Sequence, residues 1–421
     1  GKNVPIPEIG EKLNVAYIVE GSVQRAGDRV KITAQLIKAA DGFHVWSDTF
    51  TRDAKDVFAV QEEIAGRIAK ELSLKLGVTS TSSSRAVDPR AFELYLLGRR
   101  AWNLRTVEGF DQAEKAFKEA LAIEPDFARA HAALADVSLI RLSEKYSGRF
   151  DQRDSPELAK VTVMVERALA LDPNLAEAHT SLGNLFWQSW RYEDAVRELR
   201  RAIALNPNYA TAHQWLGRVL LAYGWIEEGE ASLKRAAELD PLSHRILDNY
   251  SISLTLQQRD GEALAVLDRA LALRPDSQQA LAWKADTLSA LGRHDEAVAL
   301  VRRYPVADTV YAAGAVQILA RAGLKKEANE ALAHILAGGD SEVKFAGLVE
   351  LGRMQEALDV LDPGAMGING MGYYLFDPVF DPIRQNPRFV RMLATLGMTE
   401  AHARAQAWRA AHPPKKVEAR K

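Results

Sequence analysis

Four prolines recur at a constant interval of 34 residues and constrain the fold more than any other feature: Pro173, Pro207, Pro241 and Pro275. An alanine stands five residues before each proline, and an arginine stands just before each alanine. An interval of this length holds two short helices and a turn, and such a hairpin cannot bury its apolar face without a neighbour. The interval therefore predicts a stack of helical hairpins.

The residues around the prolines keep the same phase. Small residues and leucines recur at matching places, for example Leu182-Gly183 with Ala195, and Leu216-Gly217 with Leu233. This pattern resembles that of tetratricopeptide (TPR) repeats. The resemblance implies a mainly α fold, a TPR α-α superhelix (solenoid), preceded by a small, truncated α+β domain.

Residues 88–362 are expected to hold about eight such hairpins. They are predicted at about 89–124, 176–209, 210–243, 244–277 and 278–305, with degenerate ones at about 309–337 and 341–361. In the second hairpin, Arg141–Asp154 separates helices expected at His131–Ile140 and Glu157–Leu171. This polar insertion is predicted to be a solvent-exposed loop.

The chain ends, over residues 363–421, with a predicted loop, C-terminal cap helices and a basic tail. Pro363–Gly372 is rich in glycine but lacks the Lys-Ser/Thr of a phosphate-binding loop, so it is expected to be a plain loop. Tyr373–Met398 predicts a terminal cap. Asp377 and Asp381 each precede a proline, so they are expected to cap helices rather than to form a catalytic pair.

Residues 1–78 differ from the repeats because apolar and polar residues alternate in them at the spacing of β-strands. Strands are predicted at Val15–Arg25, Arg29–Ile37 and Phe43–Thr51, between a short helix at 5–13 and a longer one at 54–76. One strand must lie at an edge with unpaired backbone groups, which would allow a homo-oligomer to form there. Residues 79–87 are mostly small and polar and predict a linker.

Several motifs in residues 1–78 carry a second resemblance, among them Tyr17-Ile18-Val19-Glu20-Gly21, Arg29-Val30-Lys31-Ile32 and Asp56-Val57-Phe58-Ala59-Val60. They are similar to the C-terminal half of the TolB N-terminal-like (FlgO-type) domain. In that family a strand, a helix and another strand come first, so the resemblance implies a partial domain. It also implies a setting, because such domains followed by TPR arrays occur in bacterial class III adenylate cyclase-like and winged-helix signalling proteins.

Composition narrows the classes of partner. The net charge of −2 gives no general attraction to nucleic acid or to an anionic membrane. The absence of cysteine excludes disulfides and thiolate metal sites and leaves a cytoplasmic or a periplasmic location open. The longest apolar stretch, near Val310–Ala320, is interrupted by Gln317 and is shorter than the ~20 residues of a membrane helix.

A candidate binding site follows from the resemblance to TPR proteins, in which the first helix of each hairpin lines the concave side. That rule selects a partner-binding groove made of Asp136, Thr180, Asn184, Trp187, Gln214, Arg218, Asp248, Thr255, Asp286 and Ser289. These side chains differ in charge and can hydrogen-bond an extended peptide. The lysines that clamp a C-terminal carboxylate in chaperone-binding repeats are not reproduced, since Thr180 and Gln214 stand in their places.

Two other sets of residues have competing interpretations. One place in three successive hairpins is occupied by a histidine, namely His131, His179 and His213, which could suggest a metal site. Helices pack ~8–10 Å apart, whereas the ligands of one metal ion lie ~2 Å from it. A role in packing is therefore preferred for these histidines. Five tryptophans could stack on a ligand, yet helical spacing favours the seams between hairpins, and only Trp187 is expected to face the groove: Trp187, Trp190, Trp215, Trp225 and Trp283.

No set of residues with catalytic, metal-binding or nucleotide-binding spacing is found, so the chain is not expected to be an enzyme or to need a cofactor. The preferred hypothesis is a non-catalytic interaction or scaffold region of a bacterial signalling or regulatory protein, with a peptide or protein partner in the groove. The alternative is the regulatory half of a larger enzyme, such as a class III adenylate cyclase. A third hypothesis is an envelope scaffold related to TolB assemblies.

Overall fold

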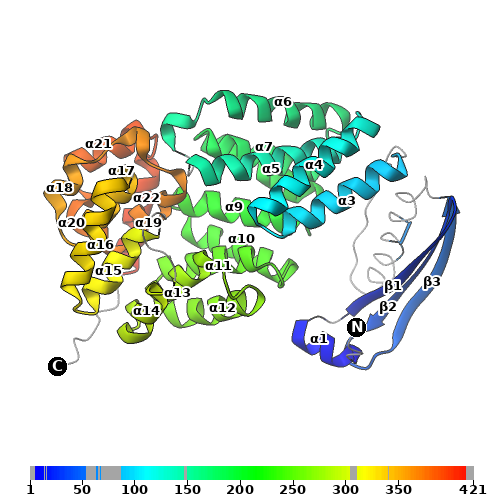
Figure 1. Ribbon diagram of the computed structural model, residues 1–421, viewed down its shortest axis with the longest axis horizontal. Helices are drawn as coiled ribbons and strands as arrows, with labels where there is room; N and C mark the ends of the chain where they lie inside the picture. The colour runs from blue at the N-terminus through cyan, green and yellow to red at the C-terminus, as the bar shows by residue number, and fades with distance from the viewer. Residues whose placement is uncertain are drawn as a thin grey trace. The chain divides into compact units, whose positions relative to one another are not determined.

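A computed structural model describes residues 5–13, 15, 17–53, 63–64, 67, 87–146, 149–303, 311–339 and 341–413. Residues 1–134 and 135–421 form two compact units. Figure 1 shows the ribbon of the chain with its helices and strands labelled. No helix within the described residues is both long and apolar enough to cross a bilayer.

The first unit begins with helix α1 (Ile6–Leu13) and an antiparallel sheet of strands β1 (Tyr17–Ala26), β2 (Arg29–Lys38) and β3 (His44–Asp53). The sheet order is β1-β2-β3, which places β2 in the middle. The three predicted strands are confirmed with ends shifted by at most two residues. The helix predicted at 54–76 and the predicted linker fall almost wholly outside the described residues.

The register of the sheet places apolar residues of β2 and β3 on one face. Ile32 pairs with Phe50, and Leu36 pairs with Trp46 just before a bulge. Leu36 and Phe50 are buried. The β1–β2 turn requires Gly27, which has a φ of 60° that a residue with a side chain rarely adopts. The sheet therefore rests on one apolar face and a two-residue turn.

The first helical hairpin consists of α3 (Pro89–Asn103) and α4 (Val107–Ile123). Asp88 caps α3 by accepting a hydrogen bond from the Arg90 amide at 2.8 Å, and Pro89 takes the first helical position. Between the helices Tyr95 contacts Phe117, with ring centroids 5.9 Å apart. The predicted cap and hairpin are thus both present.

Further hairpins follow along the chain, and most of their bounds follow the proline interval. The pairs are α5 (Ala128–Tyr146) with α6 (Pro156–Leu171), α7 (Ala176–Gln188) with α8 (Tyr192–Leu205), α9 (Ala210–Ala222) with α10 (Ile226–Leu239), α11 (His244–Leu256) with α12 (Asp260–Leu273), α13 (Gln278–Ala290) with α14 (His294–Val301), α15 (Ala312–Arg321) with α16 (Lys325–Gly338), and α17 (Ser341–Glu350) with α18 (Met354–Asp359). A mainly helical, TPR-like array is therefore present, preceded by a small three-stranded sheet.

Small residues let the two helices of a hairpin approach each other. A Cβ added to Gly183 would lie 2.6 Å from Cγ of Leu199, and one added to Gly217 would lie 2.5 Å from Cγ of Leu233. Ala202 and Ala236 are fully buried one turn further along. The small residues of the repeat pattern therefore stand where only a small side chain fits.

The prediction of a solvent loop at Arg141–Asp154 is wrong for its described part. Helix α5 continues to Tyr146, and the next described residues form a 3₁₀ turn at Phe150–Gln152. Phe150 is half-buried and meets the ring of Trp190 edge-on at 5.2 Å. Its backbone N–H donates to the Met366 carbonyl at 3.0 Å. This part of the insertion is therefore packed against the C-terminal region.

The C-terminal region is helical through most of its length. It consists of 3₁₀ turns η3 (Pro363–Ala365) and η4 (Ile368–Gly370), helix α19 (Met371–Phe376), turn η5 (Pro378–Phe380), and helices α20 (Asp381–Arg384), α21 (Pro387–Thr395) and α22 (Thr399–Ala411). The predicted plain loop at 363–372 is thus replaced by tight turns and the start of α19. The basic tail from Lys415 onward lies outside the described residues.

The two aspartates predicted to be caps behave differently. Asp377 caps η5, because its carboxylate accepts a hydrogen bond from the Val379 amide at 2.8 Å. Asp381 is itself the first residue of α20, and its carboxylate pairs with Arg384 and Arg409 instead. The prediction for Asp381 is therefore wrong, because two arginines compete for the carboxylate.

The last helix returns to the middle of the array. Nε and Nη2 of Arg404 in α22 donate to the Tyr223 carbonyl at 3.2 and 3.1 Å. The indole of Trp408 donates to Glu227 at the start of α10. A Cβ on Gly224 would lie 2.7 Å from the Ala401 carbonyl. The C-terminal region, predicted to be a terminal cap, thus also packs against α9 and α10.

The glycines of the array give a matched pair of stability tests. We expect Gly217→Ala to lower the free energy of unfolding by ~1–3 kcal/mol, because the new methyl group meets Leu233 and the Gly229 carbonyl. Gly261 lies at an exposed position of α12, where an added Cβ would have nothing within 4 Å. Gly261→Ala should instead raise the free energy of unfolding by up to ~1 kcal/mol. Denaturant melts of both variants measure the two effects, and shifts of the same sign would contradict the packing described.

Candidate functional site

The inner helices α7, α9, α11 and α13, together with α5, carry all ten residues predicted to line the groove. Seven of them are buried: Asp136, Thr180, Asn184, Trp187, Gln214, Asp248 and Ser289. Three are half-buried: Arg218, Thr255 and Asp286. Most of the candidate groove is therefore not an open surface in this structure.

Part of the set is held by bonds within the array. The Ser181 hydroxyl donates to Asp136 at 2.6 Å. The Thr180 hydroxyl donates back to the Ala176 carbonyl at 2.9 Å, and the Gln188 amide donates to Asn184 at 3.2 Å. These polar side chains are used to join α5 to α7 or to satisfy their own helix, so we assign them a structural role.

A cation–π cluster forms the centre of the remaining set. The guanidinium carbon of Arg218 lies 4.6 Å from the ring centroid of Trp187 and 4.8 Å from that of Trp215. The two indoles meet edge-on at 5.5 Å. Burial, followed by repulsion from Arg245, lowers the pKa of Arg218 to about 9. Such a guanidinium is poorly hydrated and is suited to bind an acceptor from a polypeptide.

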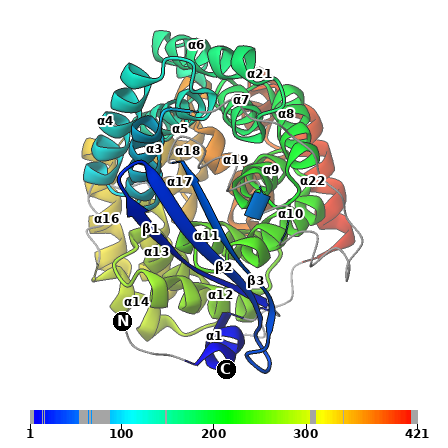
Figure 2. The ribbon, with the colours of Figure 1, turned by 90° about the vertical axis from the view of Figure 1, so that its right-hand side faces the viewer.

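The acceptor in this structure comes from the chain itself. Nη2 of Arg218 donates to the Asn369 side-chain carbonyl at 2.6 Å. Asn369 belongs to Met366–Phe376, which we call the inner segment. Its α19 packs against α9 and α11, and its Tyr374 bonds Glu342 of α17 at 2.7 Å, so Figure 2 shows it within the curve of these helices. The inner segment therefore lies on the face where a partner was expected.

Further contacts fix the rest of the inner segment. The Tyr373 hydroxyl donates to Glu350 at 2.7 Å, and the Tyr373 ring meets Trp283 of α13 at 6.4 Å. The Gly367 amide donates to Glu342 at 3.1 Å. Just beyond the segment, buried Arg384 donates to the carbonyls of Tyr374 and Asp377. Helices of four hairpins hold this stretch.

Three carboxyl groups surround Tyr373. Burial, followed by the charge of Asp377, raises the pKa of Asp286 to about 7. The same two causes raise the pKa of Glu350 well above its ordinary value. Burial also raises the pKa of Asp377, against opposing effects of the Val379 amide and Arg321. Burial thus favours the protonated form of each of these three carboxyl groups in the folded chain relative to the unfolded chain.

Other buried polar atoms on the inner helices have no hydrogen-bond partner within the described residues. They are Nε1 of Trp187, Oδ1 of Asp248, Oγ of Ser289, both side-chain polar atoms of Gln317, and Oε2 of Glu350. Burial raises the pKa of Asp248 to about 6, although Arg245 and Ser277 oppose the shift. Sequence reasoning missed Gln317 and Glu350 as site residues; the available signal was a polar residue within an apolar run, as in Phe345–Leu351.

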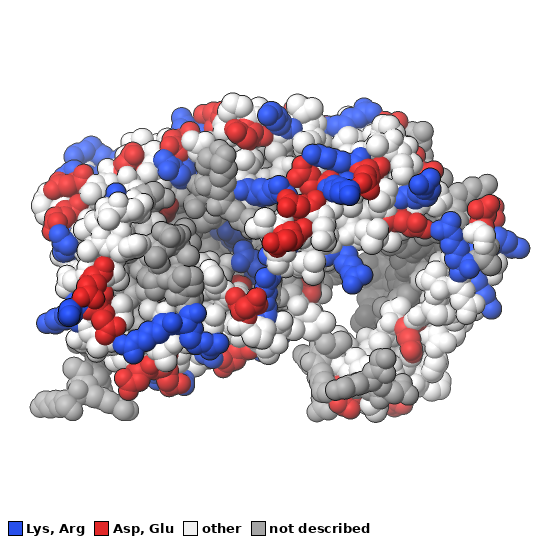
Figure 3. Space-filling model, viewed as in Figure 1, with Lys and Arg blue, Asp and Glu red and all other residues white. Residues whose placement is uncertain are grey.

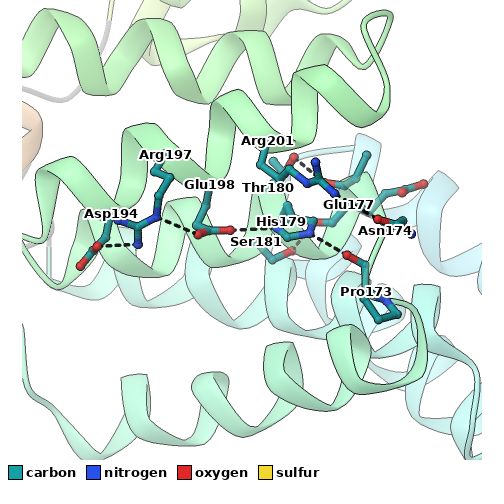
Figure 4. A network of polar contacts seen from close by, with 11 residues as sticks. Pro173, Asn174, Glu177, His179, Thr180, Ser181, Asp194, Arg197, Glu198 and Arg201 are labelled. Carbon is teal, nitrogen blue, oxygen red and sulfur yellow. Dashed lines mark hydrogen bonds and ion pairs between the residues drawn. The ribbon is translucent and has the colours of Figure 1, made fainter.

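The histidines of the repeat close turns. Nε2 of His179 donates to the Pro173 carbonyl at 3.0 Å, and Nδ1 lies 2.8 Å from Glu198 (Figure 4). His131 and His213 make the same bond to Pro125 and Pro207. No group of three potential metal-binding side chains is found among the described residues. The packing role predicted for these histidines is confirmed by these bonds.

A second recurring bond joins the second helix of a hairpin to the link that precedes that hairpin. Arg201 donates to Asn174 at 3.2 Å, and Arg235 donates to Asn208 at 3.5 Å. In each case the arginine precedes a buried alanine and the asparagine follows a proline of the 34-residue series. These arginines therefore have a structural role. On the face drawn in Figure 3, acidic and basic side chains are interspersed.

Comparisons with known families agree with this architecture. A family model described as TPR repeat matches residues 191–224, and one described as tetratricopeptide repeat matches residues 256–321. The first match covers α8 and α9, and the second covers α12 to α15. The chain thus contains TPR repeats.

One curated relative is a putative adenylate cyclase 3 of Rhizobium meliloti (strain 1021), which is 34% identical over 151 residues. The match covers 35% of this chain and 26% of the relative, so the chain spans about a quarter of that protein's length. The matched part is a minority of both proteins.

Two solved structures match parts of this chain. A thermophilic TPR protein of Thermus thermophilus is 24% identical, covering 48% of this chain and 98% of its own with a TM-score of 0.37. A tetratricopeptide repeat protein of Parabacteroides merdae is 15% identical, covering 63% of this chain and all of its own with a TM-score of 0.40.

The carboxyl cluster predicts how stability depends on pH. An acid whose pKa is raised in the folded state stabilises fully below its unfolded pKa, and this contribution is lost as pH rises through the folded pKa. We therefore expect Glu350→Gln, which cannot ionise, to melt higher than the wild type at pH 8 by roughly 2 °C, and to lose most of that advantage at pH 5.

Thermal melts of both proteins between pH 5 and pH 8 test this expectation. Glu166→Gln is the matched control, because Glu166 is exposed on α6. If the melting temperatures of Glu350→Gln and the wild type change with pH in parallel, the pKa of Glu350 is not raised by folding and the expectation is wrong.

Proposed function

We propose that this chain is a non-catalytic protein–protein interaction region of a bacterial signalling protein, and that it binds a peptide or protein partner on the inner face of the TPR array. The observation that carries the proposal is the bond from Arg218 to Asn369, with Arg218 stacked on Trp187 and Trp215. A polypeptide segment already lies on this face, so its side chains have the chemistry to hold one.

A polypeptide suits this face better than a nucleic acid. The net charge is −2, whereas nucleic-acid binding draws most of its affinity from clustered positive charge. The inner face combines arginines such as Arg218 and Arg245 with indole rings, carboxyl groups and amides, which matches the mixed donors and acceptors of a peptide. The expectation of a homo-oligomer through the edge of the sheet is separate and involves other residues.

The test is the capture of a partner from bacterial extracts by immobilised chain carrying single substitutions. We expect Arg218→Ala to reduce capture at least tenfold, because it removes the only cation of the indole cluster Trp187, Trp215 and Arg218. Arg200→Ala is the matched control, since Arg200 is exposed on α8 and pairs with Glu228. Equal capture by both variants, with unchanged circular dichroism, would remove the inner face from the proposal.

A second candidate function is the regulatory part of a larger enzyme, an adenylate cyclase. The observation that favours it is the 34% identity to a putative adenylate cyclase over 151 residues. The reading frame that contains this chain gives the test: cyclic AMP is measured with the frame intact and with the codons for residues 88–413 removed. Formation of cyclic AMP that changes on this removal supports the candidate, and a frame without cyclase activity rejects it.

A further inference from the structure

We propose that the inner segment is an internal ligand of the array, and that a partner peptide binds the inner face only when it displaces this segment. The partner is a peptide from another protein that presents a side-chain carbonyl to Arg218 and, four residues later, a tyrosine to Glu350 and Trp283. This inference rests on the proposed function and names the chemistry of its ligand.

The contacts of the inner segment are those of a bound peptide. Asn369 and Tyr373 are four residues apart, and each bonds a different inner helix: Asn369 meets Arg218 of α9, and Tyr373 meets Glu350 of α17. The apolar residues between and beyond them are buried in the same cluster: Met371, Leu375 and Phe376. Polar anchors with buried apolar residues between them are how grooves recognise peptides.

The segment also has features of a ligand that can leave. Four glycines lie within it or just before it: Gly364, Gly367, Gly370 and Gly372. Glycine loses more backbone freedom on ordering than any other residue, so docking this stretch is entropically expensive. The docked state also leaves Oε2 of Glu350 buried without a partner among the described residues. A buried polar atom left unbonded is a cost that a better ligand can remove.

Release would expose a formed site. Trp187 and Trp215 lie in α7 and α9, so the indoles beneath Arg218 are positioned by the array and not by the inner segment. Trp283 and Glu350 likewise belong to α13 and α17. Because the internal ligand is tethered, its effective concentration reaches the millimolar range, and a free peptide competes poorly until the tethered copy is weakened.

The probe for the test is a fluorescent synthetic peptide with the sequence of the inner segment, MGINGMGYYLF, titrated into the 421-residue chain. The wild type should bind it weakly. The variant Asn369→Ala with Tyr373→Phe loosens the tethered copy and leaves the inner face intact, so its apparent Kd should be at least tenfold lower. Fluorescence anisotropy measures both values, and hydrogen exchange should be faster at residues 366–376 of the variant.

A second variant is needed in case the inner segment of the first variant stays docked or that variant fails to fold. Gly370→Val places a side chain where a Cβ would lie 2.6 Å from Oε1 of Glu342 and 3.0 Å from the Tyr374 ring, so it should displace both contacts and loosen the segment. Adding Arg218→Ala to either loosened variant should abolish binding. A control peptide with asparagine and the first tyrosine changed to alanine and phenylalanine should bind at least tenfold more weakly.

Three results would overturn the proposal. The first is equal probe affinity in the wild type and both loosened variants. The second is undiminished binding after Arg218→Ala. The third is a loosened chain that forms a concentration-dependent dimer by exchanging inner segments, which makes a second copy the occupant. None of these results predicts the outcome of the capture experiment with the wild type. A chain that binds the probe peptide but captures no protein from extracts would count against the proposed function alone.

Discussion

The structure depends on close contact between the two helices of each hairpin, made at positions where only a small side chain fits. Gly217 touches the Leu233 side chain, and Ala236 is fully buried beside it. A single hairpin cannot bury its other face, so each one must stack on the next. Stacking turns the first helices inward, and the side chains they carry form one continuous inner face.

That inner face determines what the C-terminal region does. Trp187, Trp215 and Arg218 are too large and too polar to pack like the alanines of the seams. Water or a polypeptide must satisfy the guanidinium, because a buried charge without a partner is costly. The inner segment supplies Asn369 to this site. The chemistry of the face thus accounts for the segment that lies at Arg218, whereas Asp136, Thr180 and Asn184 are buried by bonds within the array.

The sequence predicts the hairpins well and the occupant of the groove not at all. The proline interval predicts a unit at 210–243, and α9 and α10 occupy 210–222 and 226–239, because small residues, prolines and turns are local signals. Asn369, by contrast, lies 151 residues after the arginine it binds, and no periodicity links the two. The glycines around Asn369 predict a loop. The tight turns found there are stabilised by contacts with distant helices, and such contacts leave no pattern in the local sequence.

The C-terminal region also changes how the array can respond. In a simple solenoid each repeat contacts only its neighbours, so stability is a sum of local terms. Here the inner segment bonds α9 and α17, and Arg404 of α22 bonds the end of α9. Hairpins that are not neighbours are thereby coupled, and they unfold or shift together more than a linear array would. If a partner displaced the inner segment, the bonds between these hairpins would break. Binding on the inner face would then alter the contacts of many hairpins, as a region that transmits a signal requires.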